Sequence, residues 1–397
     1  MKAGRSAWST PADIVASVQR LWDSGALLAA RLDGVALFPH EVRLRQPSVA
    51  AMGEQFDLVR SWIAALGAGS RGNSYELVWR DINHRQLGRN RIPDAAVIGS
   101  EAAALRMIGR AEQARRFDEL AGATTAAFPA LRPWLARQPL QLLEHEAAWE
   151  RILAVLRWFA AHPRPGIYLR QLDIPGVDTK FIEARRGLLA ELLDQVLPAE
   201  SIDAGAVGAR HFQARYGLLD KPAQIRFRML DPRHYIGGCS DLAVPVAQFA
   251  ALRSSVERVF ITENEVNALA FPDMDSSMVV FGGGYGIERL AQAEWVRGRQ
   301  VVYWGDIDTH GFAILDRLRA WMPDVRSVLM DEATLQAHCH VWGREDVDKR
   351  FLGDLQRLTT DERTLFLRLR DDLVDERLRL EQERIGYAWA VDAIRRS

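Results

Sequence analysis

Two carboxylates one residue apart follow an apolar run in the last third of the chain. The run covers residues 301–304, and Gly305, Asp306, Ile307 and Asp308 come directly after it. If the run is a strand, its period of two places Asp306 and Asp308 on the same side of the chain. Carboxylate oxygens are hard ligands that suit Mg²⁺ or Mn²⁺ better than zinc. The spacing therefore predicts a divalent-metal site, although Asp308 is also placed to cap a helix that begins near His310.

A further acidic pair lies about forty residues upstream. The apolar run at residues 256–262 is followed directly by Glu263, Asn264 and Glu265. We predict that Glu263 completes the metal site with Asp306 and Asp308 and also transfers a proton, and Glu265 is a candidate assistant. Three massed carboxylates repel one another unless a cation neutralises them. One or two such metal ions are suited to the hydrolysis of a phosphodiester.

The elements that position these acids are expected to be parallel strands. A third apolar run, residues 278–281, lies between the two acidic clusters and ends in Gly282, Gly283 and Gly284, and a helical stretch separates each pair of runs. Right-handed crossovers bring the loops after such strands to one edge of a sheet. The three glycines would let a phosphate backbone approach closely.

Further elements are expected after the acidic pair. Apolar residues at 325–330 predict another strand. Leucines at helical spacing predict a helical hairpin over residues 361–397, in which Glu381 and Glu383 are candidates to reach the metal edge.

The middle of the chain, residues 145–235, has the pattern of a DNA-binding domain. Asp178 or Thr179 can cap an amphipathic helix that follows a Pro- and Gly-containing turn, which is typical of a helix-turn-helix. The alternating run at 223–230 is expected to supply a wing. The candidate phosphate contacts are Lys180, Arg185 and Arg186 near this helix and Arg289 in the C-terminal domain.

The first 140 residues are predicted to form a mixed α/β arm. Thr10, Pro11 and Asp13 make the capping pattern of a first helix. Strands are expected at 35–38, 42–44 and 75–83, and helices at 56–66 and 101–120.

Composition narrows the class of protein. A chain of 397 residues is long enough for two or three domains, and a hydrophobic fraction of 48% can build their cores. The net charge of −1 gives no overall positive field, so contacts with DNA have to come from local patches. Two distant cysteines make no disulfide framework. Without a signal peptide or an apolar run of membrane-spanning length, we expect a cytoplasmic protein with no membrane contact.

The order of the three motifs resembles a Toprim domain over residues 240–397: Glu263 after one strand, a Gly-rich turn after the next, then Asp306-Ile307-Asp308. Topoisomerase VI A subunits and the related meiotic double-strand-break proteins carry a similar Asp-x-Asp-Pro-x-Gly motif, in which Thr309 here stands in the Pro position. In topoisomerase VI A subunits a winged-helix, CAP-like domain precedes Toprim, and residues 145–235 resemble it. The expected fold is thus a multidomain α/β protein with an arm, a winged-helix domain and a Toprim domain built on a parallel sheet.

Together with its long N-terminal half, the chain is most similar to the JetD family, the nuclease subunits of Wadjet anti-plasmid systems. That resemblance implies an Mg²⁺- or Mn²⁺-dependent endonuclease that cleaves double-stranded plasmid DNA. It also implies a homodimer that is recruited by an SMC-type ATPase complex. The chain has no Walker motif, so ATP hydrolysis is expected of its partners alone.

The resemblance departs from the topoisomerases at one point. In those relatives a Tyr of the winged-helix domain, in a motif ending in paired tyrosines, attacks the phosphodiester. Here Tyr168 and Tyr216 stand singly, which favours hydrolysis without a covalent tyrosine intermediate. Two alternatives stay open: a topoisomerase VI A-like enzyme that uses a Tyr, and a non-catalytic DNA-binding or assembly subunit whose Asp-x-Asp is structural.

Overall fold

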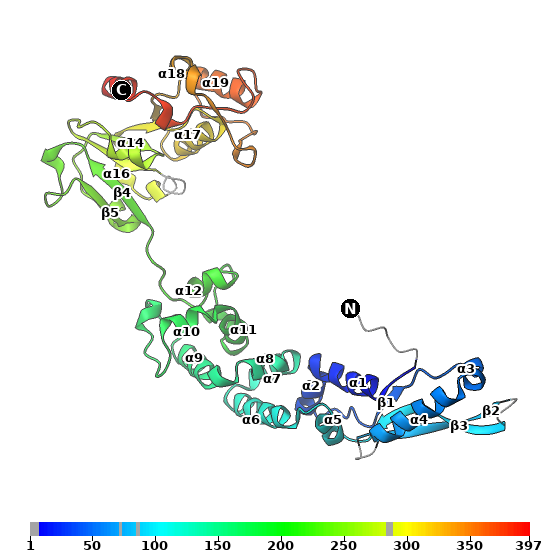
Figure 1. The fold of residues 1–397 in the computed structure, drawn as a ribbon. Coiled ribbons are helices and arrows are strands. Elements are labelled where there is room, and N and C mark those ends of the chain that lie inside the picture. Colours follow the sequence, from blue (N-terminus) through cyan, green and yellow to red (C-terminus); the bar gives the residue numbers. More distant parts are fainter. Residues whose placement is uncertain (1–7, 71–73, 85–87, 283–288) are drawn as a thin grey trace. The chain divides into compact units, whose positions relative to one another are not determined.

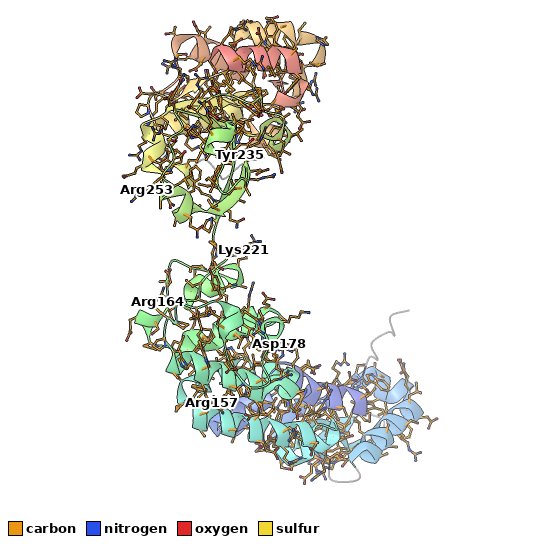
Figure 2. The ribbon with its side chains drawn as sticks, turned by 90° about the vertical axis from the view of Figure 1, so that its left-hand side faces the viewer. Arg157, Arg164, Asp178, Lys221, Tyr235 and Arg253 are labelled. Atoms are coloured by element: carbon orange, nitrogen blue, oxygen red, sulfur yellow. The ribbon has the colours of Figure 1, made fainter. Side chains whose placement is uncertain are left out.

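The computed structural model describes residues 8–70, 74–84, 88–282 and 289–397. The chain divides into two compact units, residues 1–220 and 221–397. Lys221 opens the second unit (Figure 2). The sequence had suggested three segments, with boundaries near 140 and 240. In the described residues no helix is long and apolar enough to cross a membrane.

The first unit is mostly helical (Figure 1). Its α-helices are α1 (Pro11–Asp23), α2 (Ala26–Asp33), α3 (Val49–Glu54), α4 (Phe56–Ser70), α5 (Glu101–Met107), α6 (Ala111–Ala127), α7 (Arg132–Arg137), α8 (Pro139–Glu144), α9 (Trp149–Ala161), α10 (Thr179–Glu183), α11 (Arg186–Val196) and α12 (Phe212–Arg215). The first of them begins as expected: the Thr10 side chain accepts from Asp13 N–H, and the Asp13 carboxylate accepts from Thr10 N–H.

A small antiparallel sheet accompanies these helices. Its strands are β1 (His40–Arg43), β2 (Glu76–His84) and β3 (Gly88–Ile98), in the order β1-β3-β2. One continuous core runs from Ile14 to Leu218 and joins the predicted arm to the predicted helix-turn-helix region. That continuity explains why residues 1–220 form a single unit.

The predicted helix-turn-helix region contains α10 and α11, and Asp178 is the residue that caps α10, by accepting from Phe181 N–H. The chain from 149 to 220, all of it described, holds isolated bridges but no strand. The predicted wing was wrong: residues 224–229 form β4 of the second unit, where they pair with two strands of a larger sheet. The alternation of apolar and polar residues in the sequence indicates which face of a strand is buried, but it does not indicate which strand is its neighbour in the sheet.

The second unit is built around a six-stranded mixed sheet. Its strands in the sheet are β4 (Gln224–Met229), β5 (Asp241–Pro245), β6 (Arg258–Thr262), β7 (Ser277–Phe281), β8 (Gln300–Trp304) and β9 (Arg326–Ser327). Their order is β5-β4-β7-β6-β8-β9. The four strands β7, β6, β8 and β9 are parallel, as predicted, and β4 and β5 add an antiparallel edge.

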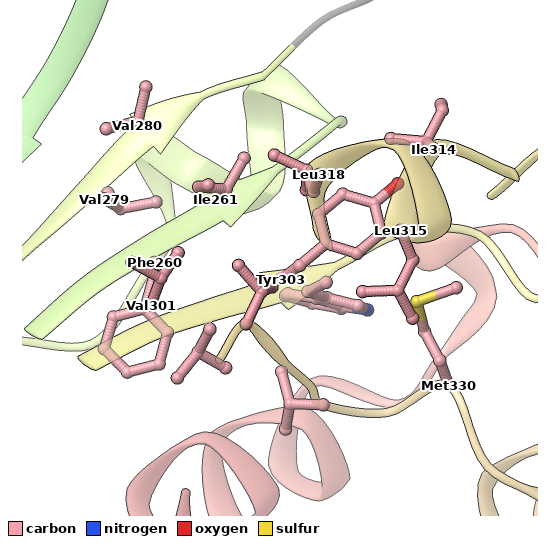
Figure 3. Close-up of a cluster of buried hydrophobic side chains, with 14 of the residues drawn as sticks. Phe260, Ile261, Val279, Val280, Val301, Tyr303, Ile314, Leu315, Leu318 and Met330 are labelled. Atoms are coloured by element: carbon pink, nitrogen blue, oxygen red, sulfur yellow. The ribbon is translucent and has the colours of Figure 1, made fainter. Parts of the chain in front are cut away.

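Helices and one short ribbon surround this sheet. The helices are α13 (Val246–Ala250), α14 (Glu265–Leu269), α16 (Glu294–Arg297), α17 (Thr309–Trp321), α18 (Glu332–Ala337), α19 (Thr360–Arg370) and α20 (Tyr387–Arg396), and the ribbon pairs β10 (Gly343–Arg344) with β11 (Leu378–Arg379). Figure 3 shows how side chains of β6, β7 and β8 gather with Leu315 and Leu318 of α17 in one buried cluster. The parallel strands β6, β7 and β8 are buried on both faces, which is why they are continuous apolar runs in the sequence.

The predicted helical hairpin at 361–397 was only partly right. Helices α19 and α20 are present, but residues 371–386 between them form β11 and a 3-10 turn. Leu373 is exposed, and Leu380 makes an extended bridge to Ile307. This non-helical segment matters because it reaches the carboxyl edge of β8.

Candidate metal centre

The sheet brings the two acidic clusters side by side. β6 and β8 are neighbouring parallel strands, and their register pairs Thr262 with Trp304. Glu263 and the Gly305–Asp308 loop therefore leave the sheet next to each other. The chain passes from β6 to β7 on one side and then to β8 on the other, so this is the point where strand order reverses. Ligands bind at such points in open α/β sheets.

One cavity of about 240 Å³ lies at this edge, and Glu263, Asp306 and Asp308 all line it. The three predicted ligands thus meet in space although forty residues separate them in the chain. Sequence reasoning missed the other lining residues, which are His310, Glu345, Asp346, Lys349 and Arg379.

Each aspartate has one carboxylate oxygen fixed by the backbone and the other turned to an arginine. Oδ1 of Asp306 accepts from Gln382 N–H at 2.9 Å, and Oδ1 of Asp308 accepts from Gly311 N–H at 2.7 Å. Arg379 Nη2 lies 2.6 Å from Asp306 Oδ2, and its Nε lies 3.2 Å from Asp308 Oδ2. Asp308 is therefore the N-cap of α17 through one oxygen, and its second oxygen remains available to a cation.

The third carboxylate is held by a tyrosine. The buried Tyr303 hydroxyl donates to Oε1 of Glu263. Burial raises the pKa of Glu263 to about 7; the Tyr303 hydrogen bond offsets part of this shift, while the charge of Asp306 adds to it. Burial also raises the pKa of Asp308 to about 7, and the nearby charge of Glu345 adds to that shift. Such raised values are typical of carboxylates gathered where a cation belongs.

The donor chemistry fits a hard divalent cation. Oδ2 of Asp306, Oδ2 of Asp308 and the Glu263 carboxylate are oxygen ligands of the kind Mg²⁺ and Mn²⁺ prefer. In the described residues, no three His, Cys, Asp or Glu side chains are arranged to hold an ion as they stand. At this site the Arg379 guanidinium contacts the Oδ2 atoms of Asp306 and Asp308, which an ion would take.

Two glycines make the close packing at this edge possible. A Cβ on Gly305 would lie 2.5 Å from the Tyr303 hydroxyl oxygen and 2.8 Å from Glu263 Oε1. A Cβ on Gly311 would overlap the carbonyl oxygen of Asp306. Gly282, the first glycine of the turn after β7, allows close packing against β6, because a Cβ there would meet Ile261 and Thr262. Gly283 and Gly284, which were expected to let a phosphate backbone approach, lie outside the described residues.

Glu345 is a fourth carboxylate at the cavity, and it organises the start of α17. It is 2% exposed, and both its oxygens accept from the Thr309 hydroxyl at 2.8 Å. It also accepts from the backbone N–H of His310 at 3.2 Å, and the Thr309 hydroxyl in turn accepts from Phe351 N–H. The Thr in the Pro position of the motif thus anchors a buried acid, which no pattern in the sequence indicated.

The Gln382 side chain ties the ends of β6 and β8 together. Its amide nitrogen donates to the carbonyl of Trp304, and its amide oxygen accepts from the Thr262 hydroxyl and from Asn264 N–H. Since Gln382 N–H also holds Asp306, this one residue fixes the geometry of both acidic loops.

Glu265, Glu381 and Glu383, the further acids that were candidates to assist the metal site, each contact another side chain outside the set of cavity-lining acids. Glu265 pairs with Arg226. Glu381 lies 3.2 Å from Arg379 Nη1, and Glu383 accepts from Asn264 Nδ2 at 2.5 Å. None of the three lines the cavity.

The candidate DNA contacts differ in their surroundings. Lys180 is exposed. Arg185 stacks on the Phe181 ring at 4.3 Å and Arg186 pairs with Glu183 at 3.1 Å, so both are half-buried in their own unit. Arg289, in the second unit, donates at 3.5 Å to the carbonyl of Gln224.

Tyr168 and Tyr216, the two tyrosines considered as possible nucleophiles, differ in their exposure to solvent. Tyr216 is 1% exposed, and its hydroxyl donates to Asp194 at 2.7 Å and lies 3.0 Å from the carbonyl oxygen of Ala190. Burial raises its pKa, and the hydrogen bond and charge of Asp194 raise it further. Tyr216 is therefore a core residue, whereas Tyr168 is 44% exposed.

Two protein-family models match the chain. One, described as "Uncharacterized protein conserved in bacteria N-term (DUF3322)", covers residues 11–194. The other, described as "Wadjet protein JetD, C-terminal", covers residues 217–394, which is nearly the whole second unit. No curated protein matches.

Proposed function

Because the chain belongs to the family of the Wadjet protein JetD, we propose that it is the metal-dependent DNA endonuclease of a Wadjet complex. Family membership supports the association with Wadjet proteins. The chemistry rests on one observation: Glu263, Asp306 and Asp308 line a single cavity at the ends of two neighbouring parallel strands.

Each acid has a defined part in this proposal. Asp306 and Asp308 would hold Mg²⁺ or Mn²⁺ together with Glu263. When bound, the ion supplies an activated water and neutralises the charge that develops on the phosphate. Glu263 is also proposed to accept or return a proton; in the metal-free chain burial raises its pKa to about 7, and a general base or acid is most effective when its pKa lies near the working pH.

The substrate is proposed to be double-stranded plasmid DNA, cut by a homodimer that an SMC-type ATPase complex recruits. Lys349 and the exposed His310 line the cavity beside the acids, and they suit the negative phosphates that flank a scissile bond. Exposed Lys180 in the first unit adds a backbone contact that carries no sequence information.

Hydrolysis is favoured over attack by a tyrosine. Tyr216 is buried and hydrogen-bonded, which leaves exposed Tyr168 as the tyrosine of the two that DNA can reach. A hydrolytic enzyme leaves no protein–DNA adduct. A denaturant-resistant adduct that disappears in Tyr168→Phe would instead support the topoisomerase-like alternative.

The deciding experiment is cleavage of a supercoiled circle with Mn²⁺ or Mg²⁺, by the chain alone and with its Wadjet partners. We expect Glu263→Gln and Asp306→Asn to abolish nicking and linearisation. Glu265→Gln is the matched control, because Glu265 lies outside the cavity and pairs with Arg226. Full cleavage by both site variants would overturn the site. A wild-type protein that binds DNA but never cuts it would support the assembly-subunit alternative.

A further inference from the structure

The Arg379 side chain uses all three guanidinium nitrogens on carboxylates. Nη2 lies 2.6 Å from Asp306 Oδ2, Nε lies 3.2 Å from Asp308 Oδ2, and Nη1 lies 3.2 Å from Glu381 Oε1. Among the lining residues, this is the cation that touches both members of the Asp-x-Asp pair. The guanidinium therefore occupies the place of a positive ion between the two aspartates.

A guanidinium and a metal ion cannot share those oxygens. Asp306 Oδ1 and Asp308 Oδ1 are held by backbone N–H groups, so Oδ2 of each residue is the atom left for a cation. Arg379 already contacts both Oδ2 atoms, and a divalent cation placed there would also repel its charge. Metal entry requires the guanidinium to move.

The backbone of Arg379 is fixed while its side chain is long. Arg379 pairs with Gly343 in the β10–β11 ribbon, and the next residue, Leu380, makes two backbone hydrogen bonds with Ile307 at 2.9 and 3.0 Å. The guanidinium can therefore swing without leaving the mouth of the cavity. A charge that has lost two carboxylate partners there needs a new anion, and arginine forks suit phosphate oxygens.

We propose that Arg379 is an internal counter-cation that the divalent metal displaces, and that the displaced guanidinium then binds a phosphate of the DNA. This exchange rests on the proposed nuclease function. It replaces one positive charge between the aspartates with two and keeps the guanidinium nearby. The added positive charge suits an incoming phosphodiester and the further negative charge of its transition state.

Metal affinity without DNA tests the first half of the exchange. Mn²⁺ binding is measured by titration calorimetry at pH 8 on full-length wild type, Arg379→Gln and Lys349→Gln. Lys349 is the matched control, because it lines the same cavity and pairs with Asp346 rather than with the aspartate pair. We expect Arg379→Gln to tighten Mn²⁺ binding by about tenfold or more, which corresponds to about 1.4 kcal/mol, and Lys349→Gln to have a clearly smaller effect.

Two results would overturn this half in different ways. A gain in Arg379→Gln no larger than in Lys349→Gln means that Arg379 acts only as a nearby charge and does not compete for the oxygens. A wild-type protein that binds no Mn²⁺, with variants that bind none either, overturns the metal site itself and with it the proposed function.

Cleavage at saturating Mn²⁺ tests the second half. Despite its tighter metal binding, Arg379→Gln should cut supercoiled DNA at least about tenfold more slowly, because a phosphate contact is lost. Arg379→Lys, which keeps the charge but not the fork, should recover part of the rate. Wild-type cleavage by Arg379→Gln at saturating metal would overturn the phosphate contact. Unchanged thermal unfolding of the variants excludes misfolding as the cause of a slower rate.

Discussion

The hydroxyl of Tyr303 donates a hydrogen bond to Oε1 of Glu263, which joins β8 to the residue that follows β6. Tyr303 is fully buried, and Gly305 leaves the space that this contact needs. The bond stabilises the ionised carboxylate and so limits the rise in the pKa of Glu263.

Tyr303→Phe removes that bond and little else. The pKa of Glu263, about 7 in the wild-type chain, should rise in this variant. At neutral pH Glu263 is then protonated in a larger fraction of the molecules, and those molecules cannot use it to bind metal. Cleavage should fall several-fold at pH 7 and recover towards pH 9. A pH–rate profile at fixed Mn²⁺ checks this, and an acid limb that stays in place would contradict it.

The metal-free protein should lose stability as pH rises from about 4 to above 7. Glu263 and Asp308 have pKa values of about 7 in the folded chain, against about 4.3 and 3.9 in an unfolded one. Between these values the folded state holds more protons than the unfolded state, so the free energy of unfolding falls with pH by about 1.4 kcal/mol per unit for each group that remains protonated. The penalty is complete above pH 7.

Melting temperatures in EDTA and in Mn²⁺ from pH 5 to 9 test this. The EDTA curve should fall with pH in wild type and be flatter in Glu263→Gln/Asp308→Asn. Stabilisation by Mn²⁺ should be larger at pH 8.5 than at pH 6, since the ligands must be ionised. A Mn²⁺ effect that is independent of pH would count against these two acids as ligands.

Thr309→Pro restores the proline of the similar topoisomerase motif and should nevertheless destabilise this protein. Proline fits the first position of α17, but the change removes the hydroxyl that binds buried Glu345 and Phe351 N–H. We expect a loss of about 1–3 kcal/mol. Adding Glu345→Gln should recover part of it, because a neutral amide costs less to bury. Scanning calorimetry of Thr309→Pro and of Thr309→Pro/Glu345→Gln measures both effects. A Thr309→Pro protein as stable as wild type would refute the role given to the Thr309 hydroxyl.

Removal of one partner of the buried ion pair between Arg319 and Glu362 should strongly destabilise the second unit at neutral pH. The two carboxylate oxygens of Glu362 lie 2.5 and 2.9 Å from Arg319, and Ser327 donates to one of them. Burial raises the pKa of Glu362, but these hydrogen bonds outweigh it and hold the pKa below its usual value. The stabilisation is therefore present above about pH 4.3 and is lost as pH falls through the folded pKa.

Glu362→Gln should cost about 3–5 kcal/mol at pH 7, because Arg319 is left buried without its counter-charge. The difference from wild type should shrink below pH 4. Asp371→Asn, in the surface pair with Arg370, is the control and should have a much smaller effect, because solvent screens a surface ion pair. A difference between Glu362→Gln and wild type that does not change with pH, in urea unfolding, would contradict the ionic origin of the effect.

The strands around the site could be predicted because their burial is local information. Parallel strands covered on both faces appear as unbroken apolar runs, and β6, β7 and β8 begin and end within two residues of the predicted ranges. The meeting of Glu263 with Asp306 and Asp308 followed from topology, since carboxyl ends of parallel strands share an edge.

What could not be predicted depends on contacts between distant segments. β4 alternates like a wing strand, and only its pairing with β5 and β7 assigns it to the second unit. Arg379 and Glu345 lie outside any motif and reach the cavity through the β10–β11 ribbon, whose strands have two residues each. So short a ribbon leaves no periodic pattern, and the regularly spaced leucines around it resembled a helix.

The roles of Arg379 and Gln382 have a consequence for synthesis of the protein. Both come later in the chain than Glu263, Asp306 and Asp308, and Gln382 bonds to the ends of β6 and β8 and to Asp306. A nascent chain on the ribosome, or one shortened before Arg379, therefore has all three carboxylates and the strands that carry them but lacks the side chain that ties the ends of β6 and β8 together.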